Sequence, residues 1–172
     1  MTIASRVLAC GAVLLGLGVA PVAPLGAQGY HVARTVVLGG DGGWDYLTLD
    51  TVGRRLFIAR QDRVMVVDPA SGKVLAEIPG LNRAHGIAFS YETGRGFATS
   101  GADSAVTIFD LASLRVVGHT TVAPDDDAIL YDPVTRRIFT FNGDAHSASV
   151  LNPASGMRIG TIELGEIGRA HV

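Results

Sequence analysis

Three residues whose side chains commonly bind metal ions recur at one position of an internal repeat. They are Asp45, His85 and Asp127, which are 40 and 42 residues apart. Carboxylate oxygens and imidazole nitrogens are ligands of divalent cations, and a histidine beside a carboxylate can act as a base. If the fold arranges the repeats around one axis, these side chains form a ring. Such a ring suits a divalent metal ion or an oxygen-rich small molecule.

Loop residues of the third repeat are further ligand-binding candidates. They are Asn142, Asp144 and His146, which we expect on the same face of the molecule as the ring. Each candidate also has a purely structural interpretation, because such side chains often bond nearby backbone amides. No residue is predicted to be catalytic, since the sequence contains neither a Gly-x-Ser-x-Gly motif nor a His-Glu-x-x-His motif.

The elements that position these candidates are predicted from a segment that occurs three times. Asp68, Asp110 and Asn152 mark corresponding positions, each 42 residues after the last, and the surrounding residues match. The three copies are residues 66–73, 108–115 and 150–157. A fixed period of about 40 residues indicates a repeat architecture.

Each repeat has the pattern of four short strands joined by turns rich in Gly, Pro and Asp. The expected strands are residues 46–49, 55–59, 63–68 and 73–78; 86–89, 96–100, 105–110 and 115–122; and 128–131, 137–141, 147–152 and 157–163. This pattern predicts an all-β chain with three four-stranded blades of a β-propeller, at about 45–84, 85–126 and 127–165. A lone strand at residues 30–38 is expected before them. A β-sandwich is the alternative, but its strands would not recur three times in register.

The repeats resemble those of a known family. The segments beginning at Phe57, Phe97 and Phe139 are similar to the Tyr-Val-Thr-Asn strand of the YVTN β-propeller repeat. The segments 39–46 and 68–73 are similar to the YncE-like branch of exported propellers. The resemblance covers residues 30 to about 165 and implies a WD40-like ring of about seven blades. It says little about function, because related repeats also occur in propeller lactonases and dehydrogenase subunits.

The N-terminus is predicted to be an export signal at residues 1–27. Arg6 precedes a 14-residue apolar segment at 7–20, and small residues before Gln28 offer a cleavage site. An uncleaved anchor and a lipoprotein box ending at Cys10 are alternatives. We expect an exported protein, periplasmic or secreted, with no membrane span after cleavage and a propeller at residues 28–165.

The last residues are interpreted as foreign to the protein. Ile167 to Val172 are what ATC GGA AGA GCA CAC GTC encodes, which is a common sequencing-adapter string. We therefore expect an adapter-derived tail at residues 166–172 and a propeller that is incomplete at its C-terminus. The terminal blades of an incomplete ring would leave apolar faces uncovered.

Composition narrows the functional classes. The formal net charge of −2 gives no basic surface for nucleic acid. We expect a non-enzymatic binding or scaffold protein whose partner is a small molecule or a protein. A divalent metal held by Asp45, His85 and Asp127 is the cofactor that the sequence would allow. The alternatives are a metal-dependent, lactonase-like hydrolase and a dehydrogenase-type propeller subunit.

Overall fold

The computed structural model describes residues 29–165, and its regular elements are almost all strands. One short 3-10 helix, η1 (Gly101–Asp103), is the exception within that range. The strands are β1 (Leu47–Asp50), β2 (Arg55–Val67), β3 (Val74–Ser90), β4 (Arg95–Ser100), β5 (Ala105–Asp110), β6 (Val116–Thr121), β7 (Asp126–Asp132), β8 (Arg137–Asn142), β9 (Ser147–Leu151) and β10 (Arg158–Glu163). The all-β prediction is confirmed, and most expected strands lie within one or two residues of those observed.

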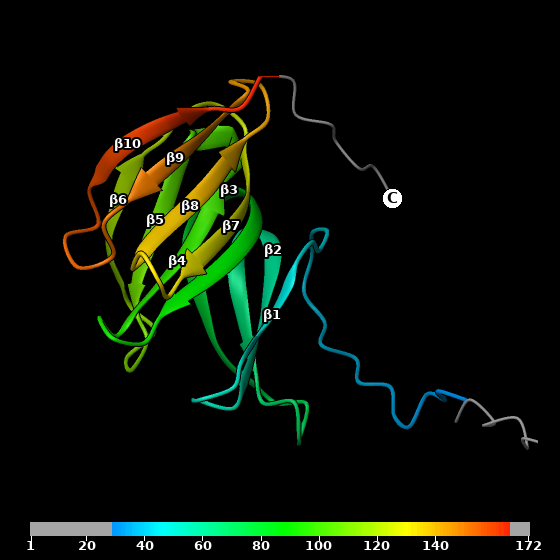
Figure 1. Cartoon of the computed structure of the whole chain (residues 1–172). Helices are drawn as coiled ribbons and strands as arrows, with labels where there is room; N and C mark the ends of the chain where they lie inside the picture. The colour runs from blue at the N-terminus through cyan, green and yellow to red at the C-terminus, as the bar shows by residue number, and fades with distance from the viewer. Residues whose placement is uncertain (1–28, 166–172) are drawn as a thin grey trace, which may run out of the picture. The chain divides into compact units, whose positions relative to one another are not determined.

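The strands form two antiparallel sheets in which sequence neighbours pair (Figure 1). One sheet has six strands in the order β1 to β6, and the other has four in the order β10-β9-β8-β7. Within each sheet every connection is a hairpin between neighbours, as short turns rich in Gly, Pro and Asp favour, and the β6–β7 connection joins the two sheets.

The first two predicted repeats belong to one continuous sheet because β3 serves both. Residues 74–79 of β3 pair with β2, whereas residues 84–90 pair with β4. Between these halves Arg83 has a φ of 60°, in the left-handed region. The loop expected at residues 60–62 is likewise absorbed into β2, where Gln61 has a φ of 56°.

The two larger buried clusters lie between successive repeats, whereas a small third one lies within the first repeat. Phe57 and Val64 of β2 share a buried cluster with Phe89 of β3 and Phe109 of β5. A second cluster joins β4 and β5 to the four-stranded sheet. Its buried members are Ala88, Phe97, Val106, Ile108, Val122, Ile138 and Leu151. Each repeat thus buries its apolar face on the next, as expected of repeat architectures.

The expectation of a strand at residues 30–38 is wrong. Residues 30–38 do not form a strand, and no described strand pairs with them. Trp44, which follows this segment, is exposed over 74% of its surface. It borders an apolar depression with Leu38, Leu47 and Ile58.

The β2–β3, β5–β6, β7–β8 and β9–β10 turns share one local hydrogen-bond pattern. In each, a side chain at the first position accepts hydrogen bonds from backbone N–H groups two or three residues later. The residues at that position are Asp68, Asp110, Asp132 and Asn152. Hydroxyl groups of Ser71, Ser113 and Thr135 donate to the three carboxylates and lower their pKa values. These acidic groups therefore shape turns.

The signal peptide expected at residues 1–27 and the tail expected at 166–172 lie outside the described residues. Within residues 29–165 there is no helix with the length and apolar character needed to cross a membrane.

Candidate functional site

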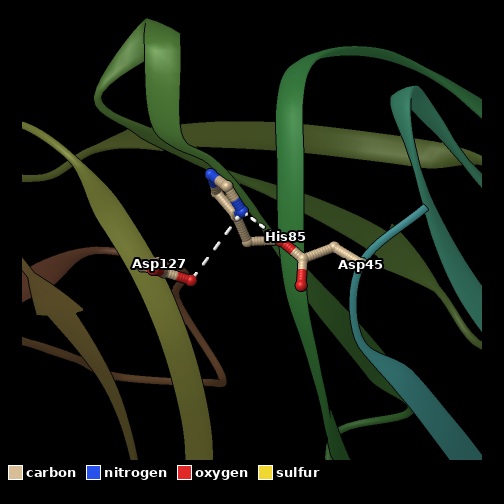
Figure 2. Close-up of side chains that lie close together, drawn as sticks. All are labelled: Asp45, His85 and Asp127. Atoms are coloured by element: carbon tan, nitrogen blue, oxygen red, sulfur yellow. Dashed lines mark hydrogen bonds and ion pairs between the residues drawn. The ribbon is translucent and has the colours of Figure 1, made fainter. Parts of the chain in front are cut away.

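Asp45, His85 and Asp127 come together, although they lie in three different repeats (Figure 2). His85 Nδ1 lies 2.5 Å from Asp45 Oδ2 and 3.8 Å from Asp127 Oδ1. One donor atom from each residue lies within 4.8 Å of the other two. We call these three residues the His85 cluster. Repeat spacing thus predicted a real proximity in space.

Asp45 is held by a backbone hydrogen bond to β2, and a buried arginine orders the loop that precedes it. Its backbone N–H donates to the Ala59 carbonyl at 3.0 Å, just before β1 begins. The guanidinium of Arg60, only 8% exposed, donates to the backbone carbonyls of residues 39–43. A single cation therefore orders the glycine-rich loop that leads to Asp45.

His85 and Asp127 approach because β3 and β7 are in close contact at Gly86. A Cβ atom there would lie 3.1 Å from the Asp127 carbonyl and 2.8 Å from Ile129. The buried hydroxyl of Thr99 accepts from the Gly86 N–H at 2.8 Å and donates to the Asp127 carbonyl at 2.7 Å. Thr99 thereby ties β3, β4 and β7 together beneath the cluster.

The hydrogen bond from Arg83 indicates which ring nitrogen of His85 carries the proton. Arg83 Nε lies 3.0 Å from His85 Nε2, and a guanidinium can only donate hydrogen bonds. His85 Nε2 must therefore be the unprotonated acceptor, so the ring proton is on Nδ1 and points to Asp45. The other end of the Arg83 guanidinium pairs with Asp125, which lies 42 residues later at the same repeat position.

The cluster has the donors and the dimensions for a divalent cation. Zinc bonds to imidazole nitrogen and carboxylate oxygen are about 2.0–2.2 Å long, which puts two tetrahedral ligands about 3.4 Å apart. The distances from His85 Nδ1 to the two carboxylate oxygens are 2.5 Å and 3.8 Å, which lie on either side of that value. The His85 side chain is 14% exposed, while those of Asp45 and Asp127 are 42% and 53% exposed. Small side-chain movements would close the site around an ion arriving from solvent.

A shallow cleft continues from the cluster along the first strand of each repeat. The residues that line it are Tyr46, Thr48, Gly86, Ile87, Ala128 and Ile129. Three of these directly follow Asp45, His85 and Asp127 in the sequence. A molecule bound to an ion in the cluster would thus have space beside it.

The other three candidates lie outside the cluster. Asn142 is fully buried, and its amide nitrogen donates to Ser147 and Ser149, so it has a structural role. Asp144 and His146 are exposed in the β8–β9 turn, where His146 has a φ of 47°. Neither belongs to the group of potential ligands that the structure brings together.

Asp126 is an unusual neighbour of the site. Its side chain is fully buried, and within residues 29–165 neither carboxylate oxygen has a hydrogen bond of ordinary geometry. Burial raises the pKa of Asp126 to about 7, although backbone N–H groups of Ser100 and Ala105 favour the charged form. The nearby Asp125 carboxylate raises the pKa further.

Sequence reasoning missed the residues that support the cluster. Arg83, Arg60 and Thr99 were not among the predicted site residues. Arg83 contacts His85, Thr99 bonds the Asp127 carbonyl, and Arg60 orders the loop before Asp45. The available signal was the repeat itself, because Arg83 and Asp125 are both two positions before a cluster residue.

Comparison with known proteins supports the fold. No family model and no curated protein matches the sequence. The hydrazine synthase of Kuenenia stuttgartiensis matches in structure at a TM-score of 0.68 and 17% identity, covering 81% of this chain and 41% of that one. Saccharomyces cerevisiae Sqt1 matches at a TM-score of 0.62 and 13% identity, covering 72% of this chain and 36% of that one. The protein U3-55K matches at a TM-score of 0.61 and 18% identity, covering 72% of this chain and 40% of that one. The chain thus spans about two fifths of these structures, and it shares their propeller-type fold.

Proposed function

We propose that this chain is part of an exported β-propeller that binds a divalent metal ion, and through it a small ligand, at the His85 cluster. The observation that carries the proposal is the convergence of Asp45, His85 and Asp127 from three repeats. A mixed set of one imidazole and two carboxylates suits Zn²⁺ or Mn²⁺ better than Ca²⁺, which prefers oxygen ligands alone.

Further features support the propeller part of the proposal. The chain matches 36–41% of its structural neighbours, which agrees with three blades of a ring of about seven. The repeats pack face to face, as blades do. The resemblance to YVTN and YncE-like repeats points to the same type of ring, in which the cluster would lie at one mouth of the central channel.

Export is proposed from residues 1–27. Secretion of the full chain with its own N-terminus should give a mature protein that begins near Gln28. Intact-mass measurement of the extracytoplasmic fraction tests this. Retention of residues 1–27 in the mature protein would contradict it.

Calorimetric titration with ZnCl₂, MnCl₂ and CaCl₂ tests the binding proposal. We expect one Zn²⁺ or Mn²⁺ per chain and weaker or no binding of Ca²⁺. The His85→Gln variant should lose that binding, whereas His119→Gln should keep it, because His119 faces Thr107 away from the cluster. Equal binding by the wild type and His85→Gln would contradict the proposal.

A hydrolase is a second candidate, and the donor count favours it. Catalytic zinc sites keep three protein ligands and an open position for water or substrate, and the cluster offers three. A metal-dependent, lactonase-like activity would then use the cleft beside the ion. Lactone and ester hydrolysis by the Zn²⁺-loaded and Mn²⁺-loaded chain, compared with His85→Gln, would distinguish an enzyme from a binding protein.

A further inference from the structure

We propose that Arg83 is an internal competitor of the metal ion, which weakens cation binding at the His85 cluster by holding His85 in the tautomer that cannot coordinate. This inference rests on the proposed function of the cluster. Arg83 itself would not coordinate the ion.

The first step concerns the atom that an ion would need. His85 Nδ1 is the ring nitrogen that faces both carboxylates, at 2.5 Å and 3.8 Å. Coordination requires a lone pair on that nitrogen. In the observed arrangement Nδ1 carries the proton, because Nε2 accepts from Arg83.

The second step concerns what Arg83 would have to do. If the Nδ1 proton moved to Nε2, two N–H groups would face each other across the 3.0 Å contact with Arg83. Arg83 would therefore have to turn away. Its side chain is 54% exposed and its other partner is Asp125, so it can leave His85 and keep that ion pair.

The third step is a comparison with ordinary metal sites. A ligating histidine usually donates its second N–H to a carboxylate or carbonyl, which fixes the ring in the coordinating tautomer. Here the second nitrogen meets a guanidinium, which is a donor and carries a positive charge. Both the hydrogen bond and the charge therefore oppose a cation at Nδ1.

The test compares Arg83→Gln with Arg136→Gln in the full chain. Arg136 is a matched control because its side chain is 70% exposed, it pairs with Glu92, and its φ of 55° resembles that of Arg83. Outer-shell partners change metal affinity by about 10–100-fold. We expect Arg83→Gln to bind Zn²⁺ at least about tenfold more tightly than the wild type, and Arg136→Gln to bind it equally.

A second measurement does not depend on metal. Long-range ¹H–¹⁵N correlation spectra of the metal-free chain report which His85 nitrogen is protonated, and His85→Gln assigns the signal. We expect the Nδ1–H tautomer in the wild type and a shift toward the Nε2–H tautomer in Arg83→Gln. A wild-type His85 protonated on Nε2 would overturn the proposal.

The outcomes separate this inference from the proposed function. If the wild type binds Zn²⁺ through His85 and Arg83→Gln binds no more tightly, the competitor role is wrong and the metal site stands. If neither protein binds Zn²⁺, both the metal site and the competitor role are wrong.

Discussion

The two ends of the strands use aspartate in opposite ways. At the end with the β1–β2 and β2–β3 turns, each carboxylate is satisfied by its own turn or by a close partner. Asp68 accepts from backbone groups two and three residues later, and Asp50 pairs with Arg55 at 2.7 Å. At the other end, Asp45 and Asp127 face a histidine from a different repeat, and Asp126 is buried without such a partner among the described residues.

This difference separates architecture from candidate function. Local side-chain bonding at the turn end stabilises the chain wherever the same turn recurs. A buried carboxylate without a hydrogen-bond partner costs stability, and proteins retain such features chiefly at functional sites. The His85 cluster is therefore the region where binding is expected, and the turn end is the region where substitutions should affect folding alone.

The largest expected effect is on stability at the turn end. Asp50 has a side chain that is 1% exposed, and Arg55, Tyr91 and the Gly53 N–H all donate to it. Burial raises the pKa of Asp50, but these donors outweigh burial and hold the pKa below its ordinary value. Asp50→Ala should lower the free energy of unfolding by about 3–5 kcal/mol, because it leaves Arg55 without its charge partner. Urea titration measures this, and a loss below about 1 kcal/mol would show that the pair is not structural.

An effect of similar size but opposite sign, which depends on pH, is expected for substitution of Asp126. Its folded pKa of about 7 lies above the unfolded value, so the folded state binds the extra proton and stability falls as pH rises from about 4 to 7. Asp126→Asn cannot ionise and should remove this fall, which amounts to a free energy on the order of 4 kcal/mol.

The Asp126 prediction is measured as a difference between two unfolding curves. The free energies of unfolding of the wild type and Asp126→Asn should diverge as pH rises from 4 to 8, with the variant more stable. Asp127→Asn is the matched control, because its side chain is 53% exposed. Parallel curves for the wild type and Asp126→Asn would show that the pKa of Asp126 is not raised in the folded state.

Replacing an aspartate by asparagine at each end of the strands compares the two regions directly. Asp45→Asn should weaken Zn²⁺ binding by about 10–100-fold, because the amide is a poorer ligand and the site loses a negative charge. Asp68→Asn should leave Zn²⁺ binding unchanged. Calorimetric titration of both variants tests this, and equal losses would mean that the effect is one of overall charge.

The smallest effect is expected for stability of the Asp68→Asn variant. Asn152 already occupies the equivalent position and accepts from Ala154 and Ser155 through its amide oxygen. Thermal melting of Asp68→Asn should therefore stay close to that of the wild type. Asp68→Ala should melt lower, because it removes the acceptor of the turn. A melting temperature for Asp68→Asn as low as that of Asp68→Ala would show that charge stabilises the turn.

Sequence reasoning succeeded where the signal was periodic. The 42-residue spacing of Asp68, Asp110 and Asn152 predicted the strands and turns, and the alignment of Asp45, His85 and Asp127 predicted their proximity. Local structure and strand register recur with the sequence repeat. Both could therefore be predicted from the periodicity alone.

The features that were not predicted depend on contacts between segments that do not repeat. The junction of two repeats through β3 depends on the left-handed conformation of Arg83, which is rare for a non-glycine residue. The role of Arg60 required knowing that five carbonyls converge on one guanidinium.

Anomalous diffraction from crystals of the chain grown with MnCl₂ or ZnCl₂ tests the central claim most directly. The account predicts one strong peak within bonding distance of Asp45 Oδ2, His85 Nδ1 and Asp127 Oδ1, with Arg83 turned away from His85. A metal peak elsewhere, with the contacts of Asp45 and Arg83 to His85 unchanged, would show that the cluster serves only to join the repeats.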